Sequence, residues 1–353
     1  MKVHLIDRGE VSGGTTGLGE GNVLCCDKRP GPELGLAQLG LALYDELEEL
    51  LGAEAGIRRK GALVVHAGAE SWGAEPARIE GLRAAGVECE LVDPAQVRAA
   101  EPELSGDLLG GSSFPRDLQC APRAIACALA REAERLGARV ETGRAAESIE
   151  VAGGRVTGVA GIAADAVVLA AGAWSAPLAR SAGLELPLEP RKGQLVRLER
   201  RPGFLQRKVI DGSYMAAVES GDAGLAVSTV VETTLDGHVL VGSSRERRGF
   251  DLGVDPGVSA ALLDSAARIA PGIRALAVDG EWAGLRPWLP GGLPAIGRSE
   301  AAEGLWVATG HEGAGVAHGP ITGRLIAQAL CGQPTALDLA PFSPDRFGSR
   351  PAS

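Results

Sequence analysis

The chain has 353 residues, of which 45% are hydrophobic and 23% charged, an ordinary composition for a globular protein of about two domains. Its net charge of −10 argues against nucleic acid and against anionic membrane surfaces as partners. No uninterrupted apolar run reaches the roughly 18 residues that a membrane-spanning helix needs, and the N-terminus lacks the pattern of a signal peptide.

The first predicted element is a strand at Lys2–Ile6, followed directly by Asp7. A short apolar run ending in an acid is typical of a parallel strand in nucleotide-binding α/β folds, where the acid binds the ribose of an adenosine. In such folds a further strand and a G-x-G-x-x-G turn come about 20 residues before the acid. Because Met1 comes immediately before this strand, we expect that unit to be missing, through a mis-set start or a real truncation.

The next part of the chain alternates helices and strands. Residues 13–21 are rich in glycine and by themselves are typical of a flexible connector, because no helix begins directly after them. Three short strands after residue 138 are predicted to form a meander that turns at Gly153 and Gly154. The predicted elements are a helix at Leu36–Leu51, a strand at Gly61–His66, a helix at Ala77–Ala85, a strand at Val87–Val92, an extended segment at Ser112–Pro115, a helix at Pro122–Leu136, the meander strands Arg139–Thr142, Ala146–Val151 and Arg155–Val159, and a buried strand at Ala166–Ala171.

From Leu188 the pattern changes to alternating residues separated by polar turns, which predicts an antiparallel sheet. The α/β pattern returns near the C-terminus. The elements expected here are strands at Val209–Val218, Leu225–Glu232 and His238–Ser243, a helix at Ser259–Ile269, a strand at Leu305–Ala308 and a helix at Pro320–Leu330. Since parallel and antiparallel patterns alternate along the chain, we expect an α/β protein in which two domains each recur non-contiguously.

The six cysteines show no C-x-x-C motif and no metal-ligand spacing with histidine. We therefore predict no metal site and reduced, mostly buried thiols in a cytoplasmic protein. The adjacent Cys25 and Cys26 are either a redox-active pair or, as we expect, two strand residues that face opposite ways.

Four stretches resemble, in order, segments of the FAD-dependent amine oxidoreductases, the family of D-amino-acid oxidase, glycine oxidase and sarcosine oxidase. They are Asp7 with Ser12–Gly17, Ala164–Ser175, Gly284–Trp288 with Leu293–Gly297, and Gly310–Gly315 with Pro320–Gly323. The resemblance implies a Rossmann-like FAD-binding domain, truncated at its N-terminus and interleaved with an antiparallel-sheet substrate domain. The FAD-binding domain is expected over 1–55, 116–184 and 284–345, the substrate domain over 56–115 and 185–283, and a tail over 346–353.

The resemblance also implies which residues bind FAD. No cysteine lies between Gly284 and Gly310, where sarcosine oxidases attach flavin covalently, so the cofactor is expected to be non-covalent. The expected cofactor residues are Asp7, Arg8, Ser12, Thr15, Thr16, Gly17, Gly21, Asn22, Ala146, Ala171, Gly172, Trp174, Gly284, Gly310, His311, Gly313, Ala314 and Gly315.

For the substrate, the resemblance implies that Arg286 binds a carboxylate bidentately, with His311 lining the site. Tyr214 either donates a hydrogen bond to the substrate or packs in the core, and Glu232 either binds a second cationic group or is an exposed strand residue. The implied reaction is hydride transfer from a small amino or imino acid to flavin N5, the substrate being a D-amino acid, glycine, sarcosine, D-hydroxyproline or an opine. No residue is nominated as a base.

Two further details resemble the flavoprotein subunits of heteromeric dehydrogenases that act on opines, D-hydroxyproline or glycine. They are Gly19–Asn22, and Gly242–Glu246 with Gly249–Asp251. This resemblance implies partner subunits. An alternative hypothesis is that the truncated chain binds little flavin and acts as a non-catalytic interaction or structural subunit.

Overall fold

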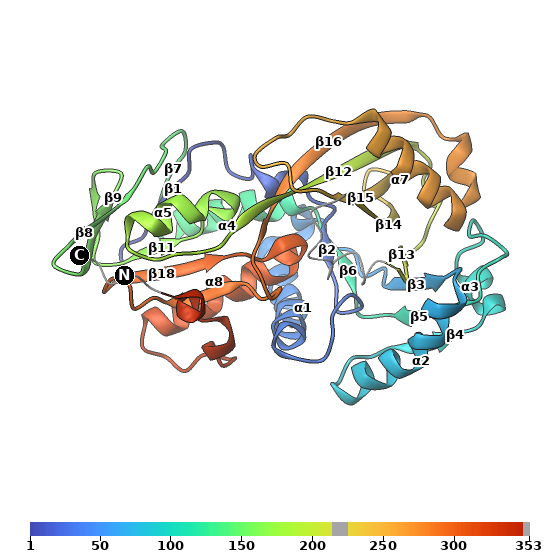
Figure 1. Ribbon diagram of the computed structural model, residues 1–353, viewed down its shortest axis with the longest axis horizontal. Helices are drawn as coiled ribbons and strands as arrows, with labels where there is room; N and C mark the ends of the chain where they lie inside the picture. The colour runs from blue at the N-terminus through green and yellow to red at the C-terminus, as the bar shows by residue number, and fades with distance from the viewer. Residues whose placement is uncertain (214–224, 349–353) are drawn as a thin grey trace.

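The computed structural model describes residues 1–213 and 225–348, which form a mixed α/β fold with parallel and antiparallel sheets (Figure 1). Tyr214 lies outside the described residues. Within those residues, no helix is both long and apolar enough to cross a membrane.

One part of the fold contains short parallel strands. Strand β1 (His4–Ile6) pairs in parallel with β7 (Arg139–Glu141), and β11 (Val167–Leu169) pairs in parallel with β18 (Leu305–Thr309). Strand β17 (Ala295–Arg298) adds to β18 in the antiparallel direction. Because parallel strands point the same way, the segments that follow β1, β11 and β18 leave the carboxyl ends of their strands, where α/β folds place their ligands.

The predicted meander after residue 138 is wrong in its first strand. Strand β7 pairs with β1 instead, and His4 Nε2 lies 3.0 Å from Glu141 Oε2 across that pair. The antiparallel sheet begins only at β8 (Ile149–Ala152), which pairs with β9 (Arg155–Val159), and β9 pairs with β10 (Ile162–Ala163). The short spacing along the chain predicted that β7 belongs to the same sheet as β8 and β9. Strand β7 instead pairs with β1, at the start of the chain.

The other part is built on an eight-stranded sheet in the order β16-β12-β15-β14-β13-β3-β5-β4 (Figure 1). All its pairs are antiparallel except that β13 runs parallel to β3, which departs from the purely antiparallel expectation. Helix α7 (Pro256–Ile269) packs on β14 and β15 with an apolar core between them. The strands are β3 (Ala62–His66), β4 (Glu90–Val92), β5 (Gly110–Phe114), β12 (Glu189–Arg200), β13 (Lys208–Asp211), β14 (Ala226–Thr233), β15 (His238–Arg245) and β16 (Val278–Trp288).

The helices begin where proline or a cap permits, in several cases earlier than predicted. Helix α1 begins at Pro32, and α8 begins at Gly315 with Pro320 inside it. Gly40 allows α1 to approach α8, because a Cβ there would lie 2.4 Å from the Ala317 carbonyl oxygen. The helices are α1 (Pro32–Leu51), α2 (Ala69–Ala84), α3 (Pro94–Ala100), α4 (Pro122–Arg135), α5 (Ser175–Ser181), α7 and α8 (Gly315–Leu330).

The cysteine pair is not in a strand. Strand β2 (Asn22–Val23) pairs with β6 (Leu118–Gln119) and ends before Cys25. The backbone N–H groups of Cys25 and Cys26 both donate to the Asp117 carboxylate, at 2.9 and 3.1 Å. Burial, together with the charge of Asp117, raises the pKa of both thiols, which argues against a redox-active pair. All six cysteines are free, and four are buried.

Candidate active site

The first part of the site is the glycine loop, residues 7–21, which follows β1. Its backbone takes a left-handed conformation at Ser12, with φ of 63°, and a Cβ at Gly17 would lie 2.2 Å from the Ser12 carbonyl oxygen. Asp7 is exposed at the end of β1 and accepts a hydrogen bond from the Gly9 N–H at 2.8 Å. The loop therefore folds tightly on itself, which only glycine permits at position 17.

The loop fits a ligand with phosphate or hydroxyl groups, as FAD has. The Ser12 hydroxyl oxygen is buried without a hydrogen-bond partner among the described residues. A Cβ built at Gly14, or at Gly172 beyond β11, would meet nothing within 4 Å. A buried polar atom without a partner costs free energy, so a group that bonds to Ser12 would be stabilised there.

The turn after β11 lies beside this loop. The Arg8 guanidinium lies 3.8 Å from the centre of the Trp174 ring, which stacks on Phe250 at 5.4 Å. The turn is fixed to the end of β18, since the Thr309 hydroxyl donates to the Gly172 carbonyl at 3.1 Å. The structure thus brings Arg8, Gly172 and Trp174 together.

Strand β16 holds the glycine loop from the other side. The Thr15 hydroxyl donates to the Leu285 carbonyl at 2.7 Å, and the Trp282 indole N–H donates to the Leu18 carbonyl at 3.0 Å. A Cβ at Gly284 would lie 3.6 Å from Leu18 Cβ, so the loop packs directly on the strand. These contacts fix the loop relative to the next residue of β16, Arg286.

Arg286 is half-buried, and its Nη1 donates to the Ser244 carbonyl at 2.9 Å. Its guanidinium lies over Gly193, where a Cβ would come within 2.1 Å of Nη1, and its stem lies 3.6 Å from the Cβ position of Gly313. Glycine at position 193 therefore makes room for the guanidinium, whereas the contact at position 313 is an ordinary van der Waals contact. The structure places Arg286 between the glycine loop and the segment 310–315.

Glu312 is a second acid of the site that the sequence analysis missed. It adopts φ of 46°, and its carboxylate lies 3.5 Å from Arg245 and 3.7 Å from Arg191. Burial alone would raise the pKa of Glu312, but the positive charges of Arg245, Arg286 and Arg191 hold it below its usual value. The acid therefore stays charged among three arginines. The three arginines around Glu312 lie on three separate strands, so no pattern of residues close together in the sequence could predict its place in the site.

The segment 310–315 ends β18 and begins α8. Gly310 has φ of 83° and packs on Leu289. His311 bonds through Nε2 to the Thr322 hydroxyl of α8 at 2.9 Å, and burial lowers its pKa to about 4, so it is neutral at pH 7. Its ring is thus held against α8. A cavity of about 270 Å³ lies against residues 310–314 and residues 27–33.

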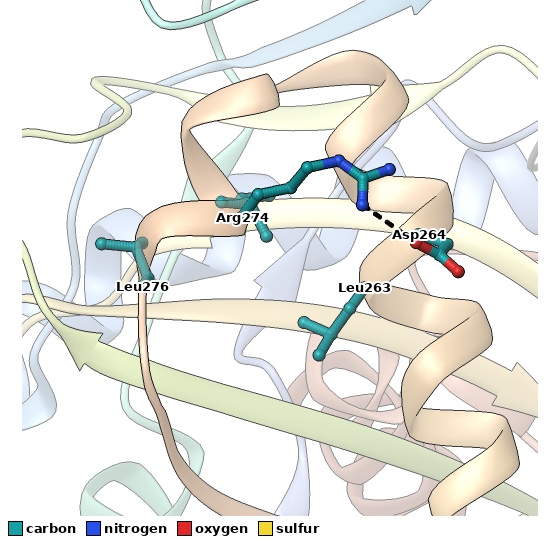
Figure 2. Close-up of a pocket in the computed structure, with 5 residues that line it drawn as sticks. Leu263, Asp264, Arg274 and Leu276 are labelled. Atoms are coloured by element: carbon teal, nitrogen blue, oxygen red, sulfur yellow. Dashed lines mark hydrogen bonds and ion pairs between the residues drawn. The ribbon is translucent and has the colours of Figure 1, made fainter.

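Two further predicted residues are buried at least in part. Ala146 packs at the edge of the core formed around β8, β9 and β11, two residues after Arg144, whose N–H donates to the Asp7 carbonyl at 2.9 Å. Glu232 is only 1% exposed and is bonded to two lysines, so its alternative as an exposed strand residue is wrong. A second concavity, beside α7, is lined by residues including Asp264 and Arg274 (Figure 2). It shares no residue with the predicted site.

The chain is similar to known proteins in sequence and in fold. Residues 1–329 match the family described as FAD dependent oxidoreductase. The chain is 38% identical to the glycine oxidase of Pseudomonas putida over 196 residues, which cover 54% of this chain and 50% of that protein. It is 32% identical to the hydrogen cyanide synthase subunit HcnC of Pseudomonas aeruginosa over 269 residues, covering 74% and 61%.

The fold is also that of a solved structure. The crystal structure of glycine oxidase from Geobacillus kaustophilus superposes with a TM-score of 0.86 at 28% sequence identity, covering 97% of this chain and 91% of that one. The chain spans about half the length, 50%, of the first relative above. The resemblance inferred from the four sequence stretches and the mixed α/β fold class are both confirmed. The chain belongs to the family of FAD-dependent oxidoreductases.

Proposed function

We propose that the protein oxidises a small amino or imino acid whose carboxylate is bound by Arg286. The observation that carries this proposal is the position of the Arg286 guanidinium, next to the glycine loop and to Gly313. A half-buried guanidinium binds a planar carboxylate through paired hydrogen bonds and so fixes the substrate's α-carbon. The glycine oxidases among the relatives support an amino-acid substrate. Glycine, sarcosine, D-amino acids, D-hydroxyproline and opines are the candidates.

In this proposal FAD is bound without a covalent link and accepts the hydride that the substrate loses. The residues of the chain bind and orient both molecules. Asp7 suits the ribose hydroxyls, and the buried Ser12 hydroxyl suits the phosphate or ribityl part. Gly313, Ala314 and Gly315 lie where α8 begins, so the N-terminus of this helix would stabilise negative charge on the flavin ring.

We further propose the domain division 1–55, 116–184 and 284–345 for FAD, and 56–115 and 185–283 for the substrate. The six free cysteines support a reducing compartment, the cytoplasm. The hydrogen cyanide synthase subunit among the relatives supports the proposal that this chain also works with partner subunits.

The test compares Arg286→Ala and Arg286→Lys with the wild type, using glycine, sarcosine, D-proline and iminodiacetate as substrates. We expect KM to rise about 100-fold in Arg286→Ala, because two charge-assisted hydrogen bonds are lost at about 1.5 kcal/mol each. Arg286→Lys should recover only part of this loss, since an ammonium group cannot bind bidentately. Arg274→Ala is the matched control, because this exposed arginine lies in the concavity of Figure 2.

Flavin binding is measured on the same proteins by visible absorption after FAD is added and free FAD is removed. Acid precipitation should then release all the flavin into the supernatant. An Arg286→Ala protein that keeps its flavin and also keeps the wild-type KM would contradict the role of Arg286. A wild-type protein that retains no flavin and turns over none of these substrates would contradict the proposed reaction.

A further inference from the structure

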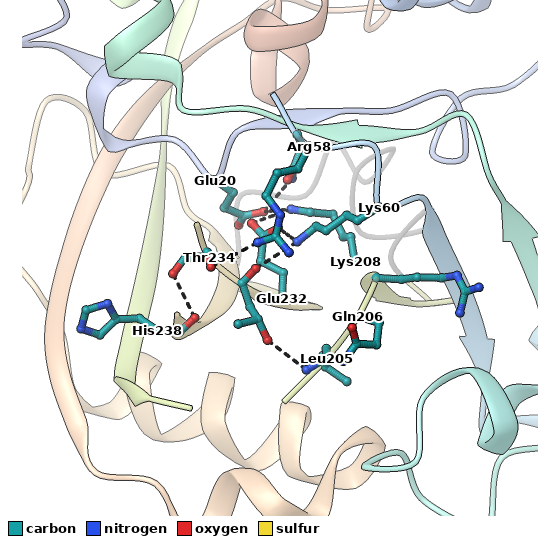
Figure 3. Close-up of polar contacts among 12 residues, drawn as sticks. Glu20, Arg58, Lys60, Leu205, Gln206, Lys208, Glu232, Thr234 and His238 are labelled. Atoms are coloured by element: carbon teal, nitrogen blue, oxygen red, sulfur yellow. Dashed lines mark hydrogen bonds and ion pairs between the residues drawn. The ribbon is translucent and has the colours of Figure 1, made fainter. Parts of the chain in front are cut away.

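Four charged side chains form a row of alternating sign (Figure 3). The function proposed above assigns no role to them. The Lys60 ammonium lies 2.7 Å from Glu232 Oε2, and the Lys208 ammonium lies 2.9 Å from Glu232 Oε1. Beyond Lys208, at 3.8 Å, lies Glu20 Oε2. The order is thus Lys60, Glu232, Lys208, Glu20, with two charges of each sign.

The row is buried at one end and reaches the glycine loop at the other. The side chains of Glu232 and Lys208 are each 1% exposed, and that of Lys60 is 5% exposed. Burial lowers the pKa of Lys60, whereas the two lysines outweigh burial and hold the pKa of Glu232 below its usual value. Glu20, on the glycine loop, is 11% exposed. It is therefore the member of the row that an incoming molecule can reach.

Glu20 is held in one orientation. The Asn22 side-chain amide donates to Glu20 Oε2 at 2.7 Å, on the same oxygen that faces Lys208. The other oxygen, Oε1, occupies the position that a Cβ of Gly242 would take, at 2.0 Å. Position 242 is consequently restricted to glycine by the Glu20 carboxylate.

Strand β15 connects this carboxylate with Arg286. Gly242, against Glu20 Oε1, lies two residues before Ser244, whose carbonyl accepts the hydrogen bond from Arg286. Glu20 and Arg286 therefore contact the same short stretch of β15, Gly242 to Ser244. An α-amino acid carries its carboxylate and its ammonium group on one carbon, so it suits a cation and a carboxylate held along one such stretch. The glycine loop that carries Glu20 is bonded to β16 beside Arg286, so the two groups are fixed relative to each other.

We propose that Glu20 binds the ammonium group of the substrate and takes its proton before the hydride leaves. This inference rests on the proposed oxidation of an amino or imino acid. One N–H bond of the substrate breaks and one O–H bond forms on Glu20, which leaves the nitrogen lone pair free. The α C–H bond would then break, with its hydride and both electrons accepted by bound FAD, and the substrate would leave as the iminium ion. Glu20 returns the proton to water at its exposed edge.

Lys208 and Asn22 act as positioning residues in this step. The Lys208 ammonium, 3.8 Å from Oε2, and the Asn22 amide hold the Glu20 carboxylate in one orientation. The Glu232 carboxylate in turn holds Lys208 in place through a bond of 2.9 Å.

The experiment compares Glu20→Gln and Glu20→Asp with the wild type, and Glu54→Gln serves as the matched control because Glu54 is exposed. Activity as kcat/KM is measured from pH 6 to 10 with glycine, sarcosine and D-proline. We expect kcat/KM of Glu20→Gln to be about 100-fold lower than that of the wild type at pH 7. Its rate should rise about tenfold per pH unit toward high pH, because the free amine is then supplied by solution. Glu20→Asp keeps the carboxylate and should keep the shape of the wild-type profile.

A binding measurement separates this role from the proposed oxidation and needs no turnover. Calorimetry compares glycine with acetate, and D-proline with cyclopentanecarboxylate, so each pair differs in the amine. We expect Glu20→Gln to weaken binding of the two amines about tenfold and to leave the two plain carboxylates unchanged. A loss of kcat/KM in Glu20→Gln that is equal at all pH values overturns the proposal, and so does a loss of binding affinity that is equal for the amine and the plain carboxylate of a pair. So does a Glu20→Asp profile that rises with pH as steeply as that expected for Glu20→Gln. A wild-type protein that turns over none of the substrates, but binds the amines more tightly than Glu20→Gln does, refutes the oxidation and leaves Glu20 as a binding residue.

Discussion

Replacing Glu232 with glutamine should destabilise the protein strongly, because it removes the negative charge that lies between two buried lysines. Glu232 bonds to Lys60 at 2.7 Å and to Lys208 at 2.9 Å, and all three side chains are nearly excluded from water. Removing one partner of a buried ion pair costs about 3–5 kcal/mol, since the remaining charge stays desolvated. At about 2.1 cal/mol/K per residue for the unfolding entropy, this corresponds to a fall in Tm of about 5 °C for 353 residues.

The destabilisation should also depend on pH with a definite sign. In Glu232→Gln, Lys60 loses the carboxylate that opposes the effects of burial and of the Lys208 charge, so the pKa of Lys60 in the folded state falls further below that in the unfolded chain. The unfolded state then binds more protons, and the stability of the variant rises relative to the wild type as pH increases from 7 towards 10. Urea unfolding at pH 7 and pH 9.5 measures this, with Glu48→Gln, an exposed pair with Arg59, as the control. A loss under 1 kcal/mol that does not change with pH would refute the reasoning.

Three further predictions concern other parts of the molecule. Gly310→Ala should lower Tm by several degrees, because φ of 83° strains alanine and its Cβ would lie 2.2 Å from Leu289 Cδ1; a Tm within 1 °C of wild type would contradict this. A thiol reagent should modify Cys331 first in the folded protein and all six cysteines after denaturation, and rapid modification of five or six without denaturant would contradict the burial. Hydrogen bonds from Arg78 and its neighbours outweigh burial and hold the pKa of Glu75 at about 2. Since that pKa is depressed, the charge of Glu75 stabilises the fold above about pH 4.3 and this contribution is lost as pH falls towards 2. Glu75→Gln should therefore cost about 3 kcal/mol at pH 7 and less at pH 3.5, measured by urea unfolding, and an equal cost at both pH values would argue against it.

The sequence alone determined those features that depend on neighbours along the chain. Local residues fix the start of α3, where Asp93 accepts from the Gln96 N–H in a capping box and Pro94 is the first helical residue. The apolar run before Asp7 predicted β1, and the order of the four glycine-containing stretches predicted the family. Arg286 could be singled out because its apolar neighbours and its stretch carry the resemblance.

Tertiary structure alone decided the contacts between distant segments. Lys60, Lys208 and Glu232 meet because β13 pairs in parallel with β3 and antiparallel with β14, and no spacing along the chain encodes those two pairings. Glu20 comes close to β15, whose Ser244 carbonyl accepts the hydrogen bond from Arg286, because a glycine at position 242 of that strand leaves room for the Glu20 carboxylate. Hydrophobic pattern and turn residues fix which segments become strands, but which strands become neighbours depends on the packing of the whole core.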